Sequence, residues 1–174
     1  MSGCSENGEA PHTCSPEASA GTYTGAYVPL VDNKAWLKLD DADDPYAQQR
    51  PEAAFCPPDS WYPEDGSLEV DTGICSWVTL TQPSLISVAC GDELRVILWH
   101  SVLASTEPAE GYAGLMVGGQ LLWEKIVPIP SDAQVYEVRW KALFPVDKGE
   151  AVHLHIHNHG ANVWNLLSLE RRSP

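Results

Sequence analysis

The chain has 174 residues, enough for a single domain with a sizeable hydrophobic core. Its formal net charge of -14 argues against nucleic acid and anionic membrane surfaces as partners. Fourteen prolines and thirteen glycines favour short elements joined by turns, and no apolar run approaches the roughly 20 residues of a membrane-spanning helix.

Residues 1–22 are predicted to form a flexible polar tether, because the segment is rich in small and polar residues. Within it, Ser2-Gly3-Cys4 matches the last part of a bacterial lipobox, in which small residues precede a cysteine that becomes lipidated. On this interpretation Met1 is only a start residue, and the hydrophobic signal would lie upstream. The sequence thus predicts a periplasmic or cell-surface lipoprotein, held to the membrane only by lipid on Cys4. The alternatives are a secreted protein without lipid and a cytosolic N-terminus with free thiols.

Five cysteines occur in the chain: Cys4, Cys14, Cys56, Cys75 and Cys90. So many in a short chain indicate an oxidising compartment, and none forms the CxxC pair of a zinc ribbon or thioredoxin-type site. Lipid on Cys4 would leave four cysteines, which allow three pairings. Cys56 with Cys75 would close a Pro- and Trp-rich loop and leave Cys14 for Cys90. A hairpin turning midway between Cys75 and Cys90 would pair those two instead; we favour the first arrangement.

Residues 23–74 are predicted to be irregular and rich in loops. They contain an acidic run formed by Asp40, Asp41, Asp43 and Asp44. Carboxylate oxygens are ligands that calcium prefers, although the run lacks the ligand order and the glycine of an EF-hand. We expect either a solvated loop or a calcium site here.

From Cys75 onward, short runs rich in β-branched and aromatic residues alternate with turn signals. The predicted strands cover residues 75–83, 84–89, 94–103, 112–119, 120–129, 135–144, 151–159 and 163–170. This spacing is typical of an antiparallel sandwich or barrel. The sequence therefore predicts an all-β protein in which residues 23–174 form one antiparallel β-sandwich domain.

The segment HLHIHNHG (153–160) places a histidine at every second position. Side chains alternate across a β-strand, so Leu154 and Ile156 lie on one side and the histidines on the other. The aliphatic side is predicted to face the core. The opposite face would then carry His153, His155, His157 and His159.

Three interpretations of these histidines stay open. Two neighbours, about 6.5–7 Å apart along the strand, could share a zinc or copper ion, but all four could not, because the first and last lie about 20 Å apart. A further ligand such as Glu150 would have to complete the site. The histidines could instead be a solvated or hydrogen-bonded strand face, or contact another ligand directly.

Alternation in LRVILWH (94–100) places His100 on the same side as Leu94, Val96 and Leu98. We expect His100 to be a buried, hydrogen-bonded histidine. In the segment NHGANVW (158–164), a tight turn is predicted in which Gly160 and Asn162 adopt positive φ.

The stretches GDELRVILWHSVL, LMVGGQLLWEKIVPIP and GEAVHLHIHNHGANVWNLLSLE together resemble the strand layout of carbohydrate-binding-module-like jelly rolls, over roughly residues 75–170. The resemblance implies a jelly-roll-like sandwich that binds a polysaccharide, or another envelope ligand, without catalysis. It also implies aromatic side chains that stack on sugar rings. The candidates are Trp61, Tyr62, Trp99, Tyr112 and Trp123, each of which could instead pack in the core.

Catalytic motifs are lacking: the sequence contains no GxSxG elbow, P-loop or GxGxxG segment. Carboxylate pairs such as Glu64/Asp65 or Glu69/Asp71 are expected by chance in so acidic a chain. The sequence therefore favours a binding protein over an enzyme. Its alternative is a metal-binding protein or metalloenzyme that uses the histidine strand, and the oligomeric state is left open.

Overall fold

The computed structural model of the protein describes residue 14, residue 23 and residues 25–158 and 160–174. The predicted tether, apart from Cys14, and the predicted ligand His159 lie outside this part of the chain. Among the described residues, no helix has the length and apolar character needed to cross a membrane. The helical content of these described ranges consists of two 3₁₀ turns, η1 (Ala47–Gln49) and η2 (Pro58–Ser60).

One sheet has six antiparallel strands, and its main path runs β3-β4-β11-β6-β9, with β1 also paired to β11. The strands are β1 (Val28–Pro29), β3 (Trp61–Glu64), β4 (Ser67–Asp71), β6 (Glu93–His100), β9 (Gln134–Lys141) and β11 (Val163–Arg172).

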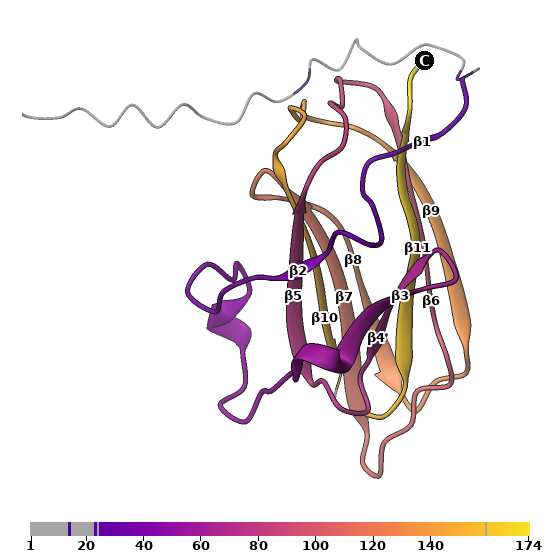
Figure 1. The fold of residues 1–174 in the computed structure, drawn as a ribbon. Helices are drawn as coiled ribbons and strands as arrows, with labels where there is room; N and C mark the ends of the chain where they lie inside the picture. The colour runs from indigo at the N-terminus through magenta and orange to yellow at the C-terminus, as the bar shows by residue number, and fades with distance from the viewer. Residues whose placement is uncertain (1–13, 15–22, 24, 159) are drawn as a thin grey trace, which may run out of the picture.

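The other sheet has five antiparallel strands in the order β2-β5-β10-β7-β8. The strands are β2 (Leu37–Lys38), β5 (Trp77–Pro83), β7 (Ala109–Val117), β8 (Gln120–Ile129) and β10 (Ala151–Asn158). The two sheets lie face to face as two layers (Figure 1). The predicted all-β antiparallel sandwich is therefore confirmed.

The core lies between the sheets and is built by the alternation of each strand. On β10, Leu154 and Ile156 are buried in it, as predicted. On β6, His100 also points inward and is fully buried. Its Nδ1 lies 2.7 Å from the carbonyl oxygen of Ser101, and its Nε2 lies 3.1 Å from the hydroxyl of Tyr136. The expectation of a buried, hydrogen-bonded histidine is thus confirmed.

Two parts of the strand prediction are wrong. Residues 84–89 form no strand, because their backbone N–H groups bond to separate partners instead of one ladder: Ser84 to Glu150, Leu85 to Leu30 and Val88 to Val146. Conversely, the segment predicted to be irregular contains the short strands β1 to β4.

The turn after β10 differs from the expectation in one residue. Asn162 has a positive φ of 148°, whereas Gly160 is not among the residues with positive φ. Gly160 is required there because a Cβ atom would collide with the carbonyl group of Ala104. The side-chain oxygen of Asn158 accepts a hydrogen bond from the Gly160 backbone N–H at 3.1 Å, which holds the reversal.

Two disulfide bonds link Cys14 to Cys90 and Cys56 to Cys75, the arrangement favoured above. The first attaches the start of the described chain to the sandwich beside β6. The second closes a loop that contains η2, β3 and β4 and ends just before β5. Disulfides of this kind are typical of proteins in oxidising compartments.

Candidate functional site

The histidine face is the outer face of the five-stranded sheet around β10, where His153, His155 and His157 are described. Because β10 pairs with both β5 and β7, the residues opposite each histidine are fixed by the register. His157 lies between Trp77 and Tyr112, and its ring is nearly parallel to both, with centroids 4.9 and 5.1 Å away. These three rings therefore stack on one another across three strands.

His155 is fully buried beneath the ring of Tyr46, which stacks on it at a centroid distance of 4.1 Å. Its Nδ1 lies 2.8 Å from the hydroxyl of Thr79, and its Nε2 lies 3.0 Å from Nδ1 of His157. Burial, reinforced by the neighbouring His157, lowers the pKa of His155 to about 3. The ring is therefore neutral near pH 7, and both of its nitrogens are already engaged.

The segment 39–50 covers this part of the face and is anchored by Asp44. The Asp44 carboxylate accepts hydrogen bonds from the indole N–H of Trp77 at 3.0 Å and from the hydroxyl of Thr79 at 2.7 Å. Burial alone would raise the pKa of Asp44, but these bonds, with one from the backbone N–H of Tyr46, lower it. The expectation of a solvated acidic loop is thus wrong for Asp44, which is buried.

The anchoring fixes the direction of a hydrogen-bond relay. Since Thr79 donates its proton to Asp44, it accepts from Nδ1–H of His155. The Nε2 of His155 must then accept from Nδ1–H of His157. This relay assigns both tautomers and occupies the lone pair on Nε2 of His155, the one that a metal ion would need there.

Gly114 allows the segment 39–50 to approach the sheet. A Cβ atom at this position would lie 2.6 Å from the Tyr46 hydroxyl and 2.8 Å from the Tyr112 ring. Any side chain larger than hydrogen would therefore push Tyr46 away from His155.

Within the part of the chain that the structure describes, no group of three or more His, Cys, Asp or Glu side chains is arranged to hold a metal ion. The ring of His153 is half-buried, burial lowers its pKa, and its Nδ1 has no hydrogen-bond partner among the described residues.

The opposite sheet carries a second set of polar and aromatic side chains, which we call the Trp99 row: Tyr62, Glu69, Asn165 and Trp99. The register places them opposite one another on β3, β4, β11 and β6, so they share the outer face of the six-stranded sheet. Adjacent strands lie about 4.8 Å apart, so the backbones of Tyr62 and Trp99 are about 14 Å apart. The Tyr62 hydroxyl donates a hydrogen bond to Glu69 at 2.6 Å.

The Trp99 hollow is an open depression over this row and the β3–β4 turn. It is lined by Glu64, Asp65, Gly66, Ser67, Glu69, Trp99, Asn165 and Leu167. Asn165 forms part of its floor and is only 2% exposed. Its side-chain oxygen accepts from the Ser67 hydroxyl at 3.3 Å, whereas its nitrogen has no hydrogen-bond partner among the described residues.

Negative charge gathers in the hollow. The neighbouring Glu69 carboxylate raises the pKa of Glu64. The hydrogen bond to Glu69 raises the pKa of Tyr62 to about 12. None of the carboxylates of Glu64, Asp65 and Glu69 forms an ion pair with any described residue.

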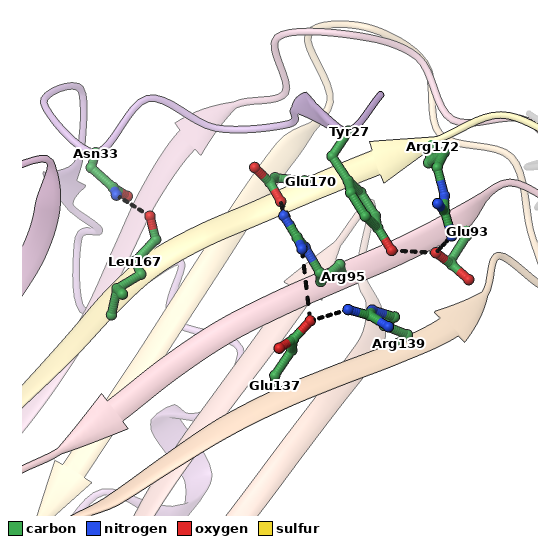
Figure 2. Close-up of polar contacts among 9 residues, drawn as sticks. All are labelled: Tyr27, Asn33, Glu93, Arg95, Glu137, Arg139, Leu167, Glu170 and Arg172. Atoms are coloured by element: carbon green, nitrogen blue, oxygen red, sulfur yellow. Dashed lines mark hydrogen bonds and ion pairs between the residues drawn. The ribbon is translucent and has the colours of Figure 1, made fainter. Parts of the chain in front are cut away.

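The basic groups of the same sheet face lie further along β6, β9 and β11, and each is paired. Figure 2 shows Arg95 between Glu170 and Glu137, with Arg139 also paired to Glu137. At the far end, Arg172 bonds to Glu93 at 2.6 Å. The Tyr27 ring covers this region, with the Arg95 guanidinium 3.8 Å from its centroid.

The five aromatic residues predicted to bind sugar therefore fall into two groups, one on the outer faces of the sheets and one packed against the core. Tyr62 and Trp99 are the two end members of the Trp99 row, and Tyr112 stacks in the histidine face. Trp61 and Trp123 pack against the core instead. Sequence reasoning missed Asn165, although its outward position follows from alternation in VWNLLSLE. It also missed Tyr46, and it named Asp44 only as part of a solvated loop or calcium site, because the anchoring role of Asp44 depends on a long-range contact.

No protein-family model matches the chain, and no curated protein matches its sequence. Among solved structures, one from work on CBM4 structure and function is 12% identical to this chain, and the match covers 83% of this chain and 94% of that chain with a TM-score of 0.45. The CBM22-1 xylan-binding domain of Paenibacillus barcinonensis Xyn10C gives 12% identity over 86% of this chain and 96% of that chain, with a TM-score of 0.32. TmCBM61 in complex with β-1,4-galactotriose gives 11% identity over 62% and 70%, also at a TM-score of 0.32. These similarities are too low to transfer a site or a ligand to this chain.

Proposed function

We propose that this protein is a non-catalytic, carbohydrate-binding domain of the bacterial cell envelope, and that a polysaccharide lies along the Trp99 row. The observation that carries the proposal is the row itself: two aromatic side chains flank a carboxylate and a buried amide on one open sheet face. Binding sites commonly combine such apolar surfaces with a few precisely placed polar groups.

Each member of the row has a distinct part in such binding. The Trp99 indole offers a surface on which the C–H face of a sugar ring can stack, and Tyr62 offers a second surface at the other end of the row. Between them, Glu69 can accept hydrogen bonds from sugar hydroxyls. The Asn165 nitrogen, which lacks a partner among the described residues, can donate one.

Two arguments favour binding without hydrolysis. Glu64 and Glu69 lie within hydrogen-bonding reach of each other, whereas the two carboxyl groups of a glycosidase are about 5–10 Å apart and flank the scissile bond. The other titratable cluster, on the histidine face, is packed beneath Tyr46 and locked in a hydrogen-bond relay. We therefore place the ligand on the six-stranded sheet and propose no metal site.

Binding assays with a panel of soluble polysaccharides test the proposal. We expect Trp99→Ala to weaken binding to the recognised polysaccharide at least tenfold, which is about 1.4 kcal/mol. Phe55→Ala removes an exposed aromatic side chain that does not line the hollow, and should leave binding unchanged. Equal affinities of the wild-type and Trp99→Ala proteins, or no binding to any member of the panel, would contradict the proposal.

The envelope location is a separate part of the proposal. The two disulfides account for four of the five cysteines, which leaves Cys4 for lipidation. Membrane fractionation of the protein expressed with its own upstream sequence tests this. The wild type should sediment with membranes, and Cys4→Ser should appear in the soluble fraction. Identical fractionation of the two would rule out the lipid anchor.

A further inference from the structure

We propose that the Trp99 hollow prefers an amino sugar, a saccharide that carries free, protonated amine groups, over neutral and acidic saccharides. This rests on the proposed function of the same surface and names the class of its ligand.

The first support is the charge of the hollow. Its lining contains three carboxylates, those of Glu64, Asp65 and Glu69, and no lysine, arginine or histidine. The pKa of Glu64 is raised because the negative charge of Glu69 lies beside it. A bound cation would relieve this repulsion, whereas a uronic acid or a sulfated sugar would add to it.

The second support is that the basic groups of the same face cannot supply that cation. Arg95, Arg139 and Arg172 lie toward the opposite ends of their strands and are each bonded to a carboxylate there. Figure 2 shows this network around Glu137 and Glu170. The acidic end of the face is therefore left for an external positive charge.

The third support is the mixture of groups in the hollow. An ammonium group placed over the Trp99 indole would gain a cation–π interaction as well as the attraction of the carboxylates. The side-chain nitrogen of Asn165 is a hydrogen-bond donor without an acceptor among the described residues. Asn165 is only 2% exposed, so leaving this donor unpaired is unfavourable. A simple ammonium ion offers no acceptor, but a sugar hydroxyl does. An amino sugar satisfies both requirements in one molecule.

Two oligosaccharides with the same β-1,4-linked backbone give a matched test, because they differ at C2 of each ring: the fully deacetylated glucosamine hexamer carries an amine and cellohexaose carries a hydroxyl. Affinities are measured by calorimetry at pH 6 and low ionic strength. We expect the glucosamine hexamer to bind at least tenfold more tightly than cellohexaose. Added salt should reduce this ratio, since exposed charges are screened.

Charge variants separate the hollow from the general acidity of the protein. Glu69→Gln should reduce the preference for the glucosamine hexamer over cellohexaose at least threefold, because the amide side chain can still accept a hydrogen bond from a hydroxyl but carries no charge. Glu124→Gln makes the same change on the outer face of the opposite sheet and should leave the preference intact. Thermal melting confirms that both variants are folded.

The possible outcomes separate the proposed amine preference from the proposed carbohydrate binding. Equal or tighter binding of cellohexaose, weakened by Trp99→Ala, would overturn the amine preference and leave carbohydrate binding standing. Equal effects of Glu69→Gln and Glu124→Gln would show non-specific attraction to a protein of net charge -14 and would also overturn it. If no saccharide binds at all, both proposals fail.

Discussion

At the scale of single residues, His155 shows how burial turns a titratable side chain into a structural one. Its ring lies between Tyr46 on one side and the edge of Trp77 on another, and it is hydrogen-bonded through both nitrogens. Protonation would place an N–H donor on Nε2 of His155, facing the N–H that His157 already donates there. The histidine face is thus stabilised by neutral imidazoles, and acid should weaken it.

The pH dependence of stability follows from the lowered pKa of His155. Below pH 6.5 the unfolded chain binds a proton at this residue, whereas the folded state does not until about pH 3. The free energy of unfolding should therefore fall, by up to roughly 1.4 kcal/mol per pH unit from this residue, as the pH drops from about 6.5 toward 3. Urea unfolding between pH 7 and pH 4.5 measures the slope.

His155→Gln is the control for this prediction, because glutamine does not titrate. The variant should be less stable at pH 7 but should show a shallower loss of stability toward acid pH. Asp44 acts with the same sign, since its pKa is lowered, but only in the carboxyl range near pH 4 and below. Parallel pH profiles for the variant and the wild type would contradict the assignment.

At the scale of elements, the segment 39–50 is attached to β5 and β10 mainly through two side chains, Asp44 and Tyr46. Asp44 bonds to Trp77 and Thr79 on β5, and Tyr46 stacks on His155 of β10. One backbone bond, from Leu39 to Thr79, marks where the segment leaves the sheet. The segment therefore depends on a few specific contacts and not on a strand ladder.

Asp44→Ala should release this segment. The change removes an acceptor from two buried donors and should cost about 3 kcal/mol of unfolding free energy. Limited proteolysis should also cut residues 39–50 faster than in the wild type. Asp43→Ala, at the exposed neighbouring position, should change stability by no more than about 0.5 kcal/mol. Similar behaviour of the two variants would show that Asp44 does not anchor the segment.

Most strands could be predicted from the sequence, but the contacts between distant segments could not. Alternation in residues 151–158 identifies the core side of β10 correctly, because one face of the sheet is buried and the period of a strand is two. Alternation cannot show that Tyr46, more than 100 residues earlier, covers the other side. Two-residue strands such as β1 and β2 also carry too short a pattern to be recognised.

The same limit applies to the Trp99 row. Tyr62 and Trp99 could be named as candidate ligands from their type alone. Their alignment with Glu69 and Asn165 depends on the pairing of β4 and β6 with β11, which comes last in the chain. Register between distant strands is set by packing of the whole sandwich, so the site could not be assembled from local patterns.

At the scale of the whole molecule, the two disulfides close loops of very different length. Cys14–Cys90 spans a sequence separation of 76 residues and Cys56–Cys75 spans 19. In the chain-entropy model the longer loop restricts the unfolded state more, giving about 4.5 kcal/mol against about 3.3 kcal/mol. The long-range disulfide should thus contribute more to stability.

Serine pairs test this order. Cys14→Ser with Cys90→Ser should lower the unfolding free energy by about 1 kcal/mol more than Cys56→Ser with Cys75→Ser, as measured by urea denaturation. A larger loss of unfolding free energy for the Cys56/Cys75 pair would contradict this order. It would mean that this disulfide also stabilises the folded positions of β3 and β4, beyond restricting the unfolded chain. In that case the second pair of variants would also lose binding at the Trp99 row.

The Cys14–Cys90 disulfide fixes the point at which the N-terminal region joins the sandwich, and this point determines where the Trp99 hollow lies when the protein is held by its N-terminal region. Cys90 and the C-terminal end of β11 lie at the Glu93 end of β6, whereas Trp99 lies at its other end, about 20 Å along the strand. Figure 1 shows the C-terminus at that same end of the sandwich. An attachment made through the N-terminal region, whether to a membrane or to a sensor chip, would therefore hold the domain by one end and present the hollow near the other, directed away from the support and accessible to long polymers.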